Sequence, residues 1–74
     1  GEFVFKDMPL SAMMEELARW YDIEVDCPAG ELGERCFHVY MDRSKTLEEA
    51  LSEIARVADI TYYRDGKKII IREK

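Results

Sequence analysis

The sequence contains an internal repeat of 37 residues, and this repeat limits the folds open to the chain. Residues 9–25 align without a gap to residues 46–62, and six of the seventeen positions are identical. The identical pairs are Leu10/Leu47, Glu16/Glu53, Ala18/Ala55, Arg19/Arg56, Asp22/Asp59 and Ile23/Ile60. Chance agreement between two amphipathic helices is the alternative, but the match continues beyond the helix into the next strand. Neither copy is long enough to bury its apolar face alone, so the two copies are expected to share one core.

Each copy has the periodicity of one amphipathic helix. Apolar residues at helical spacing predict helices over residues 10–21 and 47–58. Asp7 or Met8 is expected to cap the first helix. Thr46 opens a Thr-x-x-Glu capping box at the start of the second, in which two side chains satisfy free backbone N–H groups reciprocally.

Alternating or β-branched residues predict five strands around these helices. The strands cover residues 3–5, 23–25, 36–41, 60–63 and 67–71, with a loop expected around residues 28–33. Asp65-Gly66 predicts the tight turn of a hairpin. The predicted fold is therefore an α+β domain of two βαβ units, about residues 2–27 and 36–64, followed by a strand over 67–73. Gly1 is interpreted as a cloning remnant. The expected core comprises Phe3, Phe5, Leu10, Met14, Leu17, Val25, Val39, Leu47, Leu51, Ile54, Ile60 and Ile69.

Length and charge exclude several classes of function. A chain of 74 residues forms one thin core without a deep enclosed pocket, so neither an enzyme nor a cofactor is expected. The net charge is −5, and residues 1–35 carry nine acidic and three basic side chains. An acidic surface disfavours binding to nucleic acid or to an anionic membrane. No apolar run exceeds three residues, so this chain is not expected to span a membrane itself.

Two cysteines are candidates for a disulfide. Cys27 and Cys36 close a short span between predicted strands and are able to pair in an oxidising compartment. The alternative is two reduced thiols that pack as small apolar groups. Together with His38, the two cysteines would give three ligands for a zinc ion. Their spacing matches no standard zinc motif, and the sequence shows no fourth ligand. No metal site is therefore predicted.

Two other features are candidate partner-binding sites. Trp20 lies at the margin of the apolar stripe and is able to anchor a partner, although core packing is the alternative. The last strand has lysine and arginine side chains around its isoleucines, which is typical of a protected sheet edge. Since an edge can accept a partner strand, Lys68, Ile70 and Arg72 are the second candidate. An ordinary hairpin strand without a partner is the alternative.

Several segments resemble a known family. They are Phe3-Val4-Phe5, Met8-Pro9-Leu10, residues 16–25 with their Arg-Trp-Tyr-Asp tetrapeptide, Thr46-Leu47-Glu48-Glu49-Ala50-Leu51, Ile60-Thr61-Tyr62-Tyr63 and Ile69-Ile70-Ile71. Together they resemble the C-terminal domain of FecR-type anti-sigma factors, particularly those of the Bacteroidetes, over about residues 3–72. The short N-terminal signalling domain of secretins and TonB-dependent transducers is related and shares the duplicated βαβ plan.

The resemblance implies a non-catalytic domain that binds another protein. FecR-like proteins cross the inner membrane once, hold a sigma factor with another part of the chain, and place their C-terminal domain in the periplasm. This domain would receive a signal from the signalling domain of a TonB-dependent transporter. One alternative is an assembly or signalling module of a secretin or of the transporter itself. A small thiol or metal protein is the other.

Overall fold

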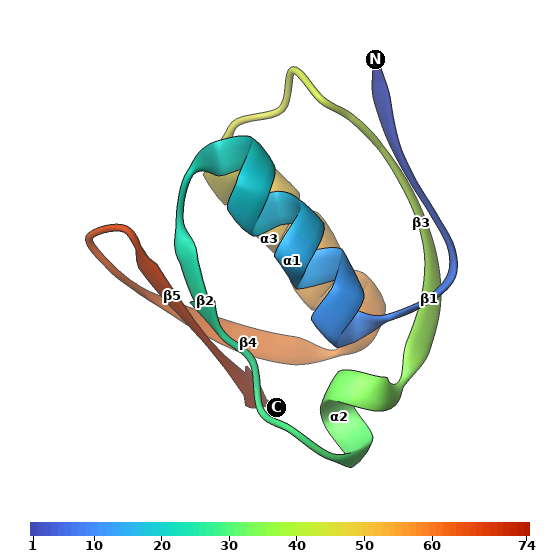
Figure 1. Cartoon of the computed structure of the whole chain (residues 1–74), viewed down its shortest axis with the longest axis vertical. Coiled ribbons are helices and arrows are strands. Elements are labelled where there is room, and N and C mark those ends of the chain that lie inside the picture. The colour runs from blue at the N-terminus through green and yellow to red at the C-terminus, as the bar shows by residue number, and fades with distance from the viewer.

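Two helices, α1 (Leu10–Tyr21) and α3 (Leu47–Ala58), lie across the middle of the molecule in a computed structural model that describes residues 1–74. Figure 1 shows β1 and β3 on one side of these helices and the other strands on the opposite side. The remaining elements are β1 (Glu2–Pro9), β2 (Glu24–Asp26), α2 (Glu31–Glu34), β3 (Cys36–Asp42), β4 (Ile60–Asp65) and β5 (Lys68–Glu73). The predicted α+β fold is confirmed.

The repeat seen in the sequence recurs in the backbone. α1 and α3 each have twelve residues, and equivalent positions begin and end them. Both helices end at an aspartate in the left-handed conformation, Asp22 at φ 53° and Asp59 at φ 56°. The backbone N–H of each aspartate donates to the carbonyl of the equivalent alanine, Ala18 or Ala55. Aspartate tolerates this conformation better than most residues, which explains why both copies carry it here.

The two helices begin differently. The predicted capping box of α3 is confirmed: the Glu49 N–H donates to Thr46 Oγ1 at 3.2 Å, and the Thr46 N–H donates to Glu49 Oε1 at 2.9 Å. The predicted cap of α1 is wrong, because Pro9 occupies the N-cap position and makes no side-chain hydrogen bond. Asp7 instead lies at an irregularity of β1 with φ 48°, where its N–H donates to His38 Nδ1.

No strand pairs with the other strand of its own copy. β1 pairs with β3 in an antiparallel sheet of two strands. β2 and β4 lie on either side of β5, which runs parallel to β2 and antiparallel to β4. The prediction that the last strand forms a sheet edge is therefore wrong. The Asp-Gly turn brings β5 back along β4, and the register Val25/Ile69 fixes its other side to β2.

A single apolar core joins the helices and both sheets. Eleven of the twelve predicted core residues are buried, and Val25 is half-buried against them. One core residue, Leu32, comes from α2, a short helix where a loop was expected. The lack of a side chain at Gly33 allows α2 to pack closely against the backbone of Pro28, because a Cβ at this position would lie 2.7 Å from the Pro28 carbonyl oxygen.

Candidate protein-interaction surfaces

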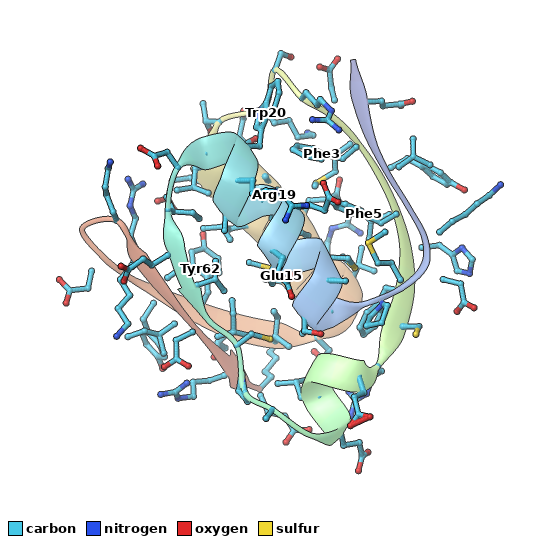
Figure 2. The ribbon with its side chains drawn as sticks, in the orientation of Figure 1. Phe3, Phe5, Glu15, Arg19, Trp20 and Tyr62 are labelled. Atoms are coloured by element: carbon cyan, nitrogen blue, oxygen red, sulfur yellow. The ribbon has the colours of Figure 1, made fainter.

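A cluster of aromatic rings and a guanidinium group lies at the C-terminal end of α1. Trp20 remains 50% exposed, and its ring meets the buried Phe3 ring edge-on, with 5.9 Å between centroids. Figure 2 shows both side chains at the end of the molecule near the N-terminus. The guanidinium carbon of Arg43 lies 4.3 Å from the Phe3 ring centroid and 4.8 Å from that of Trp20. We call Phe3, Trp20 and Arg43 the aromatic–arginine cluster.

Hydrogen bonds hold the cluster in place. The Trp20 indole Nε1 donates to the Arg43 carbonyl at 3.2 Å, and Arg43 Nε donates to the Glu2 carbonyl at 3.2 Å. The Arg43 backbone N–H also donates to the Gly1 carbonyl at 3.0 Å. These bonds join the start of β1, the end of α1 and the loop after β3. The Arg43 side chain is therefore held by its Nε bond and by the two rings that its guanidinium contacts.

The aromatic–arginine cluster includes one predicted residue and one that was missed. Trp20 was a candidate partner-binding residue, and its half-exposed ring is consistent with that role. No sequence signal pointed to Arg43, because it contacts Trp20 from 23 positions along the chain. Only the pairing of β1 with β3 brings the loop after β3 to the end of α1.

The predicted residues of the last strand lie on a sheet face. Lys68, Ile70 and Arg72 alternate with the buried Ile69 and Ile71, so they share the outer face of the β2–β5–β4 sheet. Ile70 is half-buried, and both charged side chains are exposed. A partner cannot extend the sheet at β5, since both of its sides are already paired.

Exposed apolar side chains lie on both outer sheet faces. Tyr63 of β4 pairs with Ile70 on one sheet. Val4 of β1 pairs with Tyr40 of β3 on the other, and each remains more than half exposed. The alternation of both strands was visible in the sequence and was sufficient to place Val4 and Tyr40 outward. Neither side chain was among the predicted partner-binding residues.

The two cysteines carry free thiols in the structure. Cys27 is half-buried; burial raises the pKa of its thiol, and the neighbouring Asp26 carboxylate adds to this effect. Cys36 is exposed, and its thiol donates to the Glu34 carbonyl at 3.6 Å. His38 accepts a backbone hydrogen bond through Nδ1. No group of three histidine, cysteine or acidic side chains is arranged to hold a metal ion.

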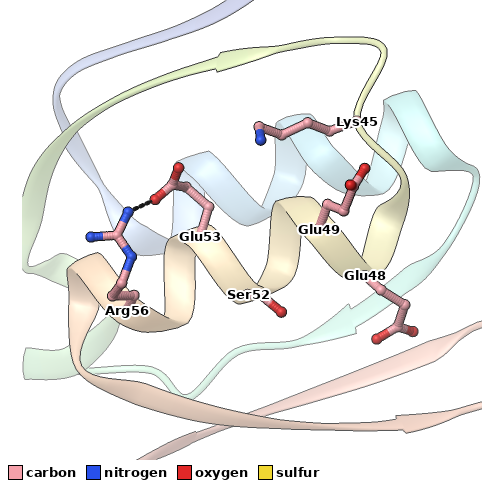
Figure 3. A pocket seen from close by; sticks show the side chains of 6 residues that line it. All are labelled: Lys45, Glu48, Glu49, Ser52, Glu53 and Arg56. Carbon is pink, nitrogen blue, oxygen red and sulfur yellow. Dashed lines mark hydrogen bonds and ion pairs between the residues drawn. The ribbon is translucent and has the colours of Figure 1, made fainter.

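The exposed side of α3 is a polar, shallow surface. Its lining residues are Lys45, Glu48, Glu49, Ser52, Glu53 and Arg56, as Figure 3 shows. Glu48 accepts hydrogen bonds from Arg64 Nη1 at 2.7 Å and from the Tyr62 hydroxyl at 3.2 Å. These bonds, chiefly the one from Arg64, lower the pKa of the Glu48 carboxyl. Through Glu48, this surface links α3 to β4.

No helix in the chain has the length and apolar character needed to cross a membrane.

Comparison with known proteins identifies the family. The sequence matches the model of the FecR C-terminal family over residues 2–71. The chain belongs to this family. No curated protein matches the sequence significantly.

Two solved structures share the fold of this FecR C-terminal domain. Both are crystal structures of a candidate anti-sigma factor from Parabacteroides distasonis ATCC 8503, at 1.65 and 2.50 Å resolution. Each superposes with a TM-score of 0.85 at 23% identity and covers 100% of this chain. The domain spans about a third of that protein, 34% of its chain. At this identity the match supports the α+β architecture.

Proposed function

We propose that this domain is the periplasmic receiving part of a single-span anti-sigma factor of the inner membrane. Its membership of the FecR C-terminal family, matched over residues 2–71, is the observation that carries this proposal. In this role the domain binds the signalling domain of a TonB-dependent outer-membrane transporter. Binding is relayed to another part of the full-length protein, which holds the sigma factor.

The surface of the domain supports protein recognition. Half-exposed or exposed aromatic and aliphatic side chains lie at separate places on the molecule, namely Trp20, Val4, Tyr40 and Tyr63. Aromatic side chains of this kind often supply most of the binding energy at protein interfaces. The domain acts by binding, without a catalytic step.

Direct binding tests the proposal. The purified domain is titrated by calorimetry with the purified signalling domains of TonB-dependent transporters from the same organism. We expect saturable one-to-one binding with a dissociation constant of about 1–100 μM, which corresponds to a modest interface. The signalling domain of an unrelated transporter is the control. Absence of binding at about 500 μM, with both domains folded by circular dichroism, would contradict the proposal.

Open strand edges favour a second candidate, an assembly module. The β1–β3 sheet has only two strands, so each strand leaves one side unpaired. Unpaired edges allow copies of a domain to join through backbone hydrogen bonds. Sedimentation velocity at high protein concentration separates the two candidates: stable rings or multimers favour assembly, and a monomer favours the receiving domain.

A further inference from the structure

We propose that Arg43 of the aromatic–arginine cluster binds an aspartate or glutamate side chain of the protein partner, with Trp20 packing against an apolar neighbour of that side chain. This inference deepens the proposed function and rests on it, because it names a surface of the domain and the chemistry of the partner that fits there.

The Arg43 guanidinium is held in place but is only partly used. Its plane contacts two aromatic rings, at 4.3 Å from the Phe3 centroid and 4.8 Å from the Trp20 centroid. Nε donates to the Glu2 carbonyl, whereas neither terminal nitrogen has a hydrogen-bond acceptor. A guanidinium presents its donors as a planar fork that matches the two oxygens of a carboxylate. Because the side chain is already ordered, binding a carboxylate here costs little additional conformational entropy.

Arg43 differs from most arginines of this chain. Four of the six, Arg19, Arg35, Arg56 and Arg64, each form an ion pair with a glutamate. Arg43 forms none, although the net charge of −5 makes carboxylates abundant. A guanidinium that has no carboxylate within the domain is available to one on a partner.

The neighbouring acidic group is engaged elsewhere. The Asp42 carboxylate lies next to Arg43 in sequence, but its Oδ1 accepts the Ser44 N–H at 2.8 Å. This bond is the main reason that the pKa of the Asp42 carboxyl is lowered, and like any exposed aspartate Asp42 is charged at neutral pH. A charged Asp42 makes a phosphate group, with its higher negative charge, a poorer fit than a single carboxylate.

Trp20 indicates that the partner segment also has an apolar side chain. Half of the Trp20 surface is exposed while its Nε1 is already bonded to the Arg43 carbonyl, so the exposed part is mainly carbon. Tryptophan and arginine are among the residues most enriched where interfaces derive their energy. The fitting segment therefore carries an acidic residue beside an apolar one.

Binding to the signalling domain of the transporter tests the site. Arg43→Lys keeps the charge but loses the planar fork and the ring contacts, and we expect about tenfold weaker binding. Trp20→Ala should weaken binding by a similar factor. The controls are Val57→Ala, the equivalent of Trp20 in the second copy, and Arg56→Lys, the same substitution at an arginine that is already paired with Glu53 within the domain. Both controls should stay within about twofold of the unaltered domain. Thermal unfolding checks that each variant is folded.

An acidic peptide gives a measurement that does not depend on the transporter. Trp20 is the only tryptophan, so its fluorescence reports on the cluster directly. We expect acetyl-Phe-Glu-Phe-amide to change this fluorescence saturably at about millimolar concentration, and acetyl-Phe-Gln-Phe-amide to act at least about fivefold more weakly. Arg43→Gln, which removes the positive charge, should remove the difference between the two peptides.

The outcomes separate the inference from the proposed function. If the signalling domain binds and the Arg43 and Trp20 variants bind equally well, the inference is wrong and the proposed function stands. If the signalling domain does not bind but the acidic peptide is preferred through Arg43, the carboxylate site stands and the proposed partner is wrong. Equal responses to both peptides, together with unaltered binding by Arg43→Lys, would overturn the site.

Discussion

The three consecutive isoleucines of β5 provide the sharpest test of the fold. Ile69 is 0% exposed and lies between β2 and β4, whereas Ile70 faces outward and is half-buried. Replacing a fully buried isoleucine by alanine removes three carbon atoms and leaves a cavity, which costs about 2–5 kcal/mol. For a domain of this size the free energy of unfolding is about 4–11 kcal/mol. Ile69→Ala should therefore remove a large part of it.

The same substitution at Ile70 is the matched control. Because Ile70 loses only part of its contacts, Ile70→Ala should cost about 1 kcal/mol or less. Urea unfolding followed by circular dichroism and Trp20 fluorescence gives both values, and an unchanged dependence on urea shows that the unfolded states are comparable. Equal costs for the two variants, or a larger cost for Ile70→Ala, would refute the assigned inward face of β5 and its central place in the sheet.

Three further predictions follow from local interactions. Thr46→Ala removes one side of the capping box and should lower the free energy of unfolding by about 1 kcal/mol in urea; no change would mean that α3 does not need its cap. The lowered pKa of Glu48 contributes stability that is present above the ordinary carboxyl pKa of 4.5 and is lost as the pH falls through the lower folded value. In Glu48→Gln the free energy of unfolding should therefore fall less as the pH drops below 4.5. A fall as steep as in the unaltered protein would contradict the role of Arg64. Finally, Cys36 should react with a thiol reagent faster than Cys27, whose raised pKa keeps it protonated to higher pH. Single serine variants assign the two rates, and a protein without reactive thiols after purification under oxidising conditions would show that Cys27 and Cys36 pair.

The helices and strands could be predicted from the sequence because their signals are local. The capping box at Thr46, the apolar stripes and the Asp-Gly turn each depend on residues within a few positions of one another. The cap of α1 was mispredicted because Pro9 takes the N-cap position, where a side-chain hydrogen bond is impossible. α2 was missed because four residues are too few to show a helical period.

The pairing of strands could not be predicted in the same way. Charged residues around Ile69–Ile71 are typical of an edge, yet the same side chains are accommodated in a central strand because they alternate onto its outer face. Only part of the aromatic–arginine cluster could be predicted, because its residues are distant in the sequence. Trp20 was visible as an aromatic residue at the margin of a helix, but Arg43 reaches it only through the tertiary fold.

The central position of β5 has a consequence for the order in which the domain folds. The parallel register pairs Glu24 with Lys68, so β2 has no strand partner until β5 has been made. Contacts between distant parts of a sequence form slowly, since the intervening chain must first be ordered. A nascent chain that stops before β5 leaves β2 and β4 unpaired and lacks Ile69 and Ile71 of the core. Such a chain is a target for chaperones and proteases, so quality control of this domain depends on β5.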